Sequence, residues 1–325
     1  MARLSKWLVA AGACITVLAN PLGSALARPP EAVAALRPEV GYPTADELAN
    51  GAELHAFFSP RDISRARLRW NWRRFSTAEY VTTGLAASTA LAAQVINPSP
   101  GRWRGGILFD EDARDSLRLG SYQSRRMARD VSDVLVAMTV SYPVLVDGLI
   151  AANWYYESPD VAEQLILIST ETLAITAAVQ GVVSTAVSRE RPYGRTCGTS
   201  ELGGDTRDCE ATGRHRSFYS GHSSMAFAGA SLVCINRAYL PLHGGGVPDA
   251  ATCVTAYAAA ATTAALRVAG DMHYASDVMV GASWGTLAGL SIPWLLHYRH
   301  DFSTPSSFAT YLVPFPGGVA MGGHF

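Results

Sequence analysis

Two histidines and one aspartate stand in short polar motifs that border long apolar stretches. His222 follows Ser220 and Gly221, and His273 precedes Asp277 by four residues. On a helix this spacing puts His273 and Asp277 on one face, so the carboxylate can hold one imidazole nitrogen and leave the other free as a nucleophile. His222, beside a helix start, is suited to proton transfer. The pattern predicts nucleophilic and acid–base chemistry.

Arginines near these motifs indicate that the reacting group is an anion. Arg191 ends one apolar stretch just before a proline, Arg189 stands two residues earlier, and Arg267 ends another stretch. Planar guanidinium groups bind phosphate oxygens in a bidentate manner. The helix start at Ser220 and Gly221 adds backbone N–H groups that favour a bound anion. Each motif alone is more typical of an ordinary helix end, but together they predict a phosphate site.

Six apolar stretches rich in small residues must position these motifs. They are too long for strands and lack period-two alternation, which predicts an all-α bundle. The linkers between them carry charges, prolines and glycines. The stretches are residues 80–96, 131–153, 163–187, 219–239, 252–269 and 278–297, and the main linkers are 97–130, 188–217 and 240–250.

In order and internal spacing, the three motifs resemble those of the phosphatidic acid phosphatase type 2 superfamily, which also contains bacterial acid phosphatases and vanadium haloperoxidases. The motifs span residues 184–277, and the helix layout extends the resemblance to 80–297. It implies a six-helix core. The matching residues are Arg191-Pro192 in motif one, Ser220-Gly221-His222 in motif two, and Arg267, His273 and Asp277 in motif three.

The resemblance implies hydrolysis of a phosphate monoester, with a lipid phosphate or a small organic phosphate as substrate. His273 would form a phosphohistidine, with Asp277 orienting its ring, and His222 would protonate the leaving oxygen and later activate water. No metal or other cofactor is implied. The phosphate oxygens would be held by Arg191, Arg267, Ser220 and the backbone N–H of Gly221, with Arg189 as a further candidate.

Three positions depart from the family pattern. Ser184 stands where motif one has a lysine, Tyr219 replaces the proline of motif two, and Leu266 replaces the serine of motif three. The lost lysine matters most, because it removes one cationic phosphate ligand. We expect a nearby arginine to take its place, the candidates being Arg189, Arg214 and Arg216.

Two other functions fit the same residues. A vanadate-dependent haloperoxidase would bind vanadate through His273 and use His222 as the acid–base group, although Asp277 suits the phosphatases better and the chain is short for the peroxidases. A degenerate phosphate-binding protein of the cell envelope is suggested by Ser184. Against it, both histidines and Asp277 are retained, and binding alone requires no nucleophile.

The composition limits the partners of the chain. With 26 basic and 27 acidic residues the net charge is -1, so no global field attracts nucleic acid. Charged residues make up 16% and hydrophobic residues 49%, which indicates a large interior or contact with lipid. We therefore expect a phosphorylated small molecule or lipid as the partner, no nucleic acid, and some association with a membrane.

The N-terminus has the features of a secretory signal. A basic start, an apolar stretch at 7–19 and the small-residue site at 25–27 predict cleavage after Ala27. An uncleaved anchor and a lipoprotein modified at Cys14 are the alternatives. The predicted divisions are a signal peptide at 1–27, an N-terminal extension at 28–79, a phosphatase domain at 80–300, and an irregular C-terminal tail at 301–325 with a short strand near 308–313. The basic, aromatic part of the extension could lie on a membrane or form an amphipathic helix packed on the domain.

Export allows disulfides, and Cys197 and Cys209, which flank one polar loop, are predicted to form one. Cys234 and Cys253 lie in apolar stretches and are predicted to be core thiols. No cysteine pair has the spacing of zinc ligands.

The apolar stretches contain acidic residues that bear on localisation. Asp133, Asp147 and Glu171 interrupt them, and a charged group near a bilayer centre costs about 2.5 to 3.5 kcal/mol. If the signal is cleaved and all six stretches cross the membrane, the site falls on the inner side, against the family pattern. We therefore expect an exported periplasmic domain, soluble or membrane-associated, in preference to a multi-pass inner-membrane protein.

Overall fold

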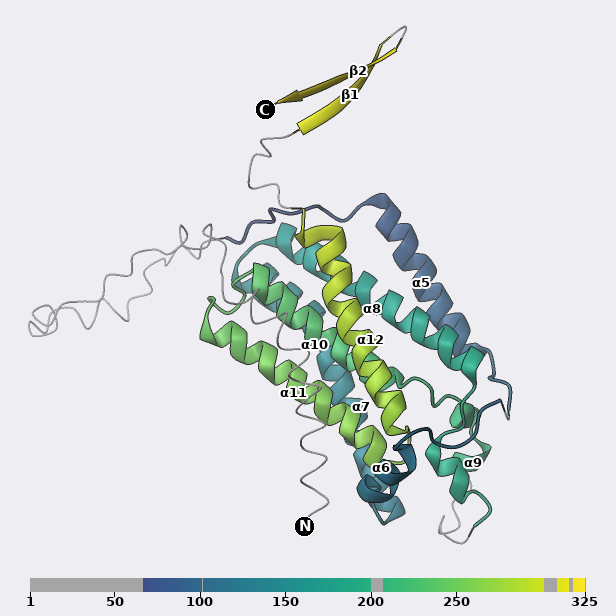
Figure 1. Cartoon of the computed structure of the whole chain (residues 1–325). Coiled ribbons are helices and arrows are strands. Elements are labelled where there is room, and N and C mark those ends of the chain that lie inside the picture. Colours follow the sequence, from purple (N-terminus) through teal and green to yellow (C-terminus); the bar gives the residue numbers. More distant parts are fainter. Residues whose placement is uncertain (1–66, 101, 200–206, 301–308, 316–317, 325) are drawn as a thin grey trace, which may run out of the picture. The chain divides into compact units, whose positions relative to one another are not determined.

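The computed structural model describes residues 67–100, 102–199, 207–300, 309–315 and 318–324. The predicted signal peptide at 1–27 and most of the extension at 28–79 lie outside these ranges. All six apolar stretches form helices, which confirms the all-α fold (Figure 1). The helices are α5 (Thr77–Val95), α7 (Tyr122–Tyr142) continuing as the π-helix η1 (Pro143–Tyr155), α8 (Pro159–Val187), α10 (Gly221–Tyr239), α11 (Val247–Ala269), and α12 (Ala275–Pro293) continuing as the π-helix η5 (Trp294–Tyr298).

The predicted linkers contain further short helices. Helix α7 begins at Tyr122 rather than near residue 131, because Ser121 accepts a hydrogen bond from Ser124 N and caps a polar first turn. The remaining short elements are α6 (Asp110–Leu117), α9 (Arg207–Glu210) and the 3₁₀ turns η2 (Pro192–Thr196) and η4 (Thr212–His215).

Local sequence sets the helix ends that border the motifs. At the start of α10 the hydroxyl of Ser220 accepts from Ser223 N, and at the start of α12 the Asp277 carboxylate accepts from Tyr274 N. Ser188 takes a φ of 50° and ends α8. Motif one therefore leaves the helix just before its arginines.

Helix α10 packs against α7, α8, α11 and α12. Its approach to α12 depends on glycines spaced four residues apart on α12. A Cβ at Gly281 would lie 2.6 Å from the Ser220 carbonyl oxygen, and one at Gly289 would lie 2.6 Å from that of Ala228. Larger residues would push the helices apart, so these glycines bring the start of α10 directly against α12.

Two disulfides join parts of the helical domain. Cys197 and Cys209 are bonded with their Cα atoms 5.8 Å apart, closing the polar loop after α8. Cys234 and Cys253 are also bonded, with Cα atoms 4.7 Å apart, so the prediction of free core thiols for this pair is wrong. The reason is tertiary, because α10 and α11 pack side by side and bring the two residues face to face.

The described part of the C-terminal tail, predicted to be irregular with a short strand near 308–313, is extended. Strands β1 (Ala309–Phe315) and β2 (Gly318–His324) form an antiparallel hairpin in which Ala309 pairs with His324. The short strand predicted near 308–313 falls largely within β1. A run of threonine, tyrosine, leucine and valine favours extended backbone, and a two-residue connection is typical of hairpins.

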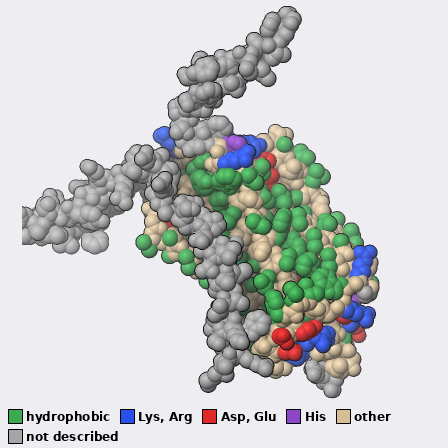
Figure 2. All heavy atoms as spheres, in the orientation of Figure 1, with side chains coloured by type: hydrophobic (Ala, Val, Ile, Leu, Met, Phe, Trp, Pro, Cys, Tyr) green, Lys and Arg blue, Asp and Glu red, His purple; other side chains and the backbone are tan. Residues whose placement is uncertain are grey.

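Large hydrophobic side chains remain exposed on the outer faces of the helices. Trp154 is 74% exposed, Leu91 is 70% exposed and Leu287 is 60% exposed. Figure 2 shows hydrophobic side chains spread over the visible face of the helical domain, with charged ones mainly toward its ends. Within the part of the chain that the structure describes, three helical segments are able to cross a membrane by length and composition: Tyr122–Tyr155, Pro159–Val187 and Ala275–Tyr298.

The acidic residues of these segments do not face outward as a group. Asp147 is fully buried and pairs with Arg237 at 2.8 Å, and Glu171 is 1% exposed. The insertion cost expected for Asp147 and Glu171 therefore does not apply, because protein groups surround them. The structure is compatible with membrane association.

Candidate active site

The three motifs meet at one end of the bundle, joined by backbone hydrogen bonds. Ser217 N donates to the Arg189 carbonyl at 2.9 Å, which links the segment before α10 to the segment after α8. Ser220 N donates to the Asp277 carbonyl at 3.0 Å, which links α10 to α12. The C-terminal end of α8 and the N-terminal ends of α10 and α12 thus form one scaffold for the site.

His273 lies in the loop between α11 and α12 and is 2% exposed. Its Nδ1 is 2.7 Å from the Ser217 carbonyl oxygen. A carbonyl only accepts, so Nδ1 carries the proton and Nε2 keeps its lone pair. Burial, followed by the charges of Arg191 and Arg267, lowers the pKa of His273 well below 6.5. The imidazole is therefore neutral near pH 7 and has the form that a nucleophile requires.

Asp277 does not contact the His273 ring, in contrast to the prediction. Its carboxylate accepts hydrogen bonds from the Ser217 hydroxyl at 2.6 Å, from Tyr274 N at 3.0 Å and from Arg189 Nη1 at 2.6 Å. The predicted pairing assumed that both residues lie on one helix, but α12 begins only at Ala275. Asp277 instead holds Ser217, whose carbonyl in turn holds His273.

His222 is paired with a residue that the motifs do not include. Its Nε2 lies 2.8 Å from Oδ1 of Asp133 on α7, and the same oxygen accepts from Arg267 Nη1 at 2.9 Å. Burial, then Arg267, lowers the pKa of His222 to about 4, while Asp133 acts in the opposite direction. The only signal for Asp133 in the sequence was its presence as an acidic residue in an apolar stretch.

Arg191 and Arg267 have N–H groups that the described residues leave without a partner. The buried Nε of each makes no hydrogen bond there, and the recorded contact of the Arg191 guanidinium is with the Met272 sulfur at 3.5 Å. A buried N–H group without an acceptor is costly. These two groups therefore fit an anion placed between them and the histidines.

Ser220 and Gly221 form the start of α10 beside these arginines. Ser220 is fully buried, and its hydroxyl accepts from the backbone and side chain of Ser223. The backbone N–H groups of Gly221 and His222 lie in the first turn, where a helix offers no acceptor. Neither N–H group has a backbone acceptor within the described part of the chain. Both are therefore free to bind an oxyanion.

Arg189 does not have the geometry of a phosphate ligand, contrary to the prediction. It is fully buried between the rings of Trp103 and Tyr274, at 4.3 and 4.2 Å from their centroids. A guanidinium has five N–H bonds, and here all of them have acceptors. The acceptors are the Gly105 carbonyl, which takes two, the Ser276 hydroxyl and the carboxylates of Asp277 and Asp110.

The other two candidates for the lost lysine are also engaged elsewhere. Arg214 pairs with Glu190, with the nearest atoms 2.6 Å apart, and Arg216 donates to the carbonyls of Ala93 and Ile96 at the end of α5. Ser184 itself is buried and donates to the Gly181 carbonyl.

A different arginine lies beside the site, on the face of α7 that carries Asp133. Arg129 Nε donates to the Gly270 carbonyl at 2.8 Å, in the loop that leads to His273, and its Nη1 pairs with Asp208 at 2.6 Å. Burial lowers the pKa of Arg191, and the charge of Arg129 lowers it further. The motifs gave no indication of Arg129.

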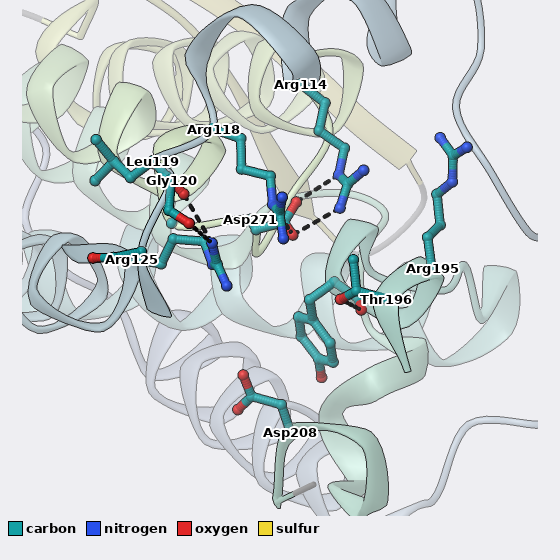
Figure 3. Close-up of polar contacts among 12 residues, drawn as sticks. Arg114, Arg118, Leu119, Gly120, Arg125, Arg195, Thr196, Asp208 and Asp271 are labelled. Carbon is teal, nitrogen blue, oxygen red and sulfur yellow. Dashed lines mark hydrogen bonds and ion pairs between the residues drawn. The ribbon is translucent and has the colours of Figure 1, made fainter. Parts of the chain in front are cut away.

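A cluster of charges fixes the loop that carries His273 (Figure 3). Asp271 accepts two hydrogen bonds from Arg114, at 2.6 and 2.9 Å, and one from Arg118 at 2.9 Å. Asp271 has a φ of 60°, an unusual value for a residue other than glycine. These ion pairs hold the loop in the shape that presents His273.

Comparisons with known proteins give a family match for part of the chain. Neither the curated proteins nor the solved structures include a significant match to this chain. The model of the PAP2 superfamily matches residues 165–301, a range that holds all three motifs. This match supports an activity of the phosphatase type. The motifs at this end of the bundle thus lie within the part of the chain that matches the PAP2 superfamily.

Proposed function

We propose that the protein hydrolyses phosphate monoesters through a phosphohistidine formed at His273. The main support is the state of that ring, which is buried, neutral and held through Nδ1, with Nε2 unprotonated. The unpartnered N–H groups of Arg191 and Arg267 supply the complementary charge for a phosphate.

In the first step, Nε2 of His273 attacks phosphorus and the bond to the ester oxygen breaks. His222 donates its proton to that leaving oxygen. In the second step, water gives a proton to His222 and attacks phosphorus, which breaks the P–N bond and releases phosphate. Arg191, Arg267 and the Gly221 N–H stabilise the charge on the equatorial oxygens.

The low pKa of His222 in the free protein is compatible with this role. A bound phosphate dianion is an opposite charge next to the ring and favours the imidazolium. Substrate binding therefore raises the pKa of His222 and prepares it as the acid. Asp133 keeps Nε2 of the ring oriented and favours the same charged form.

Arg129 supplies the positive charge that the family's motif-one lysine, replaced here by Ser184, would provide. It is the arginine that α7 contributes next to the His273 loop, and its Asp208 partner is itself partly exposed. It compensates the phosphate charge mainly through the electrostatic field of the site, since two of its nitrogens are already bonded to Gly270 and Asp208.

The preferred substrate class is a lipid phosphate. Large apolar side chains are exposed on α5, η1 and α12, among them Leu91, Trp154 and Leu287, and such a surface is suited to contact with lipid. A membrane-associated enzyme meets lipid phosphates at the bilayer surface, where their head groups are concentrated.

The test is phosphate release by the full chain in detergent from a lipid phosphate, a prenyl diphosphate, a nucleotide and an aryl phosphate. His273→Asn is compared with wild type and with His300→Asn, a change outside the site. We expect activity, strongest on the lipid phosphate, that disappears only in His273→Asn, together with an acid-labile phosphoryl group trapped on the wild type.

Release by folded His273→Asn at the wild-type rate would exclude the proposed nucleophile. A folded wild-type protein that is inactive on all four substrates would indicate the degenerate binding protein. Oxidation of bromide after addition of vanadate, without phosphate release, would indicate the haloperoxidase.

A further inference from the structure

A second group of titratable side chains lies at the other end of α12, far from His273. Glu79 in the first turn of α5, Glu171 in α8 and His297 in η5 converge there, with one donor atom from each within 4.8 Å of the others. All three are buried, at 5%, 1% and 0% exposure. Along α12 and η5 they are roughly 30 Å from the catalytic end.

Two atoms in this group face each other without a hydrogen-bond partner among the described residues. They are Oε2 of Glu171 and Nε2 of His297, separated by 3.9 Å. His297 Nδ1 lies 3.0 Å from the Arg73 carbonyl and must donate to it, so on a neutral ring Nε2 carries a lone pair. An unpaired carboxylate oxygen and an imidazole lone pair directed at each other in a protein interior are unfavourable.

The remaining atoms of the group are held by neighbours. The Thr82 hydroxyl donates to Glu171 Oε1 at 3.2 Å, and Ser76 donates to Glu79 Oε2 through both its N–H and its hydroxyl at 2.6 Å. The Arg73 carbonyl fixes the imidazole. Such outer contacts around a donor set are typical of metal sites, where they orient the ligands.

The charge of the cluster leaves room for a cation. The Arg73 guanidinium pairs with Glu79 at 3.2 Å, which neutralises one of the two carboxylates. Among the described residues, the Glu171 carboxylate has no arginine or lysine paired with it, and its only ion-pair contact there is with the His297 ring, at 3.9 Å.

We infer that Glu79, Glu171 and His297 bind a divalent transition-metal ion. Donor atoms around a tetrahedral ion with bonds near 2.1 Å lie about 3.4 Å apart. His297 Nε2 and Glu79 Oε1 are 3.5 Å apart, close to this value. One imidazole and two carboxylates suit ions such as Zn²⁺ and Mn²⁺.

The role of the ion is structural. It links α5, α8 and η5, which are far apart in the sequence, and it lies far from the phosphate site. No step of phosphate hydrolysis depends on it. The inference is therefore independent of the proposed function, and the two can fail separately.

The test uses the full chain, treated with a chelator, dialysed, and then titrated with Zn²⁺, Mn²⁺ or Co²⁺ alone. We expect one metal ion per chain by elemental analysis, a visible absorption band with Co²⁺, and a rise of roughly 5 °C or more in Tm at saturating metal. Glu171→Gln and His297→Gln should lose all three responses. Glu163→Gln, an exposed change on α8, and His300→Gln should keep them.

A wild-type chain that binds none of the three ions above the level of the variants, with a Tm indifferent to chelator and metal, would overturn the inference. The cluster would then be a network closed by a proton on His297. If the glutamine variants fail to fold, the Co²⁺ spectrum of the wild type decides, because an imidazole and two carboxylates give a protein-bound band that free Co²⁺ lacks. Phosphate release by the chelated protein below its Tm should be unchanged.

Discussion

Arg189 and Arg191 are separated by one residue, yet they lie in opposite environments. Arg189 is fully buried, and every N–H it has is bonded, two of them to the carboxylates of Asp110 and Asp277. Arg191 has a buried Nε with no partner in the described chain and no carboxylate paired with it there. The first is a closed structural ion pair, whereas the second is an open site for an anion.

The difference teaches how to separate a structural arginine from a binding one. Both residues follow the same helix and both would pass as phosphate ligands in a motif. The number of N–H donors already bonded distinguishes the two arginines. A guanidinium with all five donors bonded can bind a ligand only by breaking contacts it already has. The predictions below test this distinction.

The largest effect is expected at the open site. Arg191→Met should lower kcat/KM by roughly 10³-fold, because one guanidinium that stabilises the transferring phosphoryl group is lost. The Tm should hold or rise, since an unpaired buried charge is removed. Phosphate release and thermal melts measure both. Arg195→Met, an exposed change in η2, should alter neither, and a large loss of stability in Arg191→Met would contradict the open-site description.

The closed site should behave in the opposite way. Arg189→Met should lower the free energy of unfolding by about 3–5 kcal/mol, because Asp110 and Asp277 are left buried without their partner. Denaturant titration gives the value. A variant that is as stable as wild type but has lost phosphate affinity would show that Arg189 is a ligand after all.

Anion binding should stabilise the protein through Arg191. Inorganic phosphate or vanadate at 100 times its Kd should add about 2.7 kcal/mol and raise the Tm by roughly 5 °C. The shift should vanish in Arg191→Met and persist in Arg195→Met. An equal shift in all three proteins would mean that the anion binds elsewhere.

The smallest effect concerns the pH dependence that His222 confers. Its acid form is needed, so kcat/KM should fall as the pH rises through the pKa of the free protein, near 4. Asp133 raises that pKa and Arg267 lowers it. In Asp133→Asn the fall of kcat/KM with pH should therefore begin at lower pH, with roughly a tenfold loss of kcat/KM at fixed pH.

In Arg267→Met the fall of kcat/KM should begin at higher pH, although the lost phosphate contact also lowers the rate. Opposite displacements in the two variants would establish the Asp133–His222–Arg267 arrangement. If the pH dependence of kcat/KM is unchanged in Asp133→Asn, Asp133 does not take part in acid–base catalysis.

Much of the fold was predictable from the chain because the determinants are local. Apolar stretches of helical length, ended by residues such as Pro192 and capped by residues such as Ser220, specify helices without reference to the rest of the molecule. The motifs around His222 and His273 likewise identified the end of the bundle where the site lies. The loop disulfide of Cys197 and Cys209 also depends on a short segment.

The features that the sequence did not predict depend on contacts between residues far apart in the chain. Only the packing of α7 against α10 and α11 brings Asp133 to His222, and only the packing of α10 and α11 joins Cys234 to Cys253. Asp277 lost its predicted contact with the imidazole because the helix starts after His273. The roles of Arg189 and Arg191 likewise emerge from their neighbours in space. A sequence specifies which groups are present and how each helix begins and ends, but whether a charged group is satisfied depends on its surroundings in three dimensions.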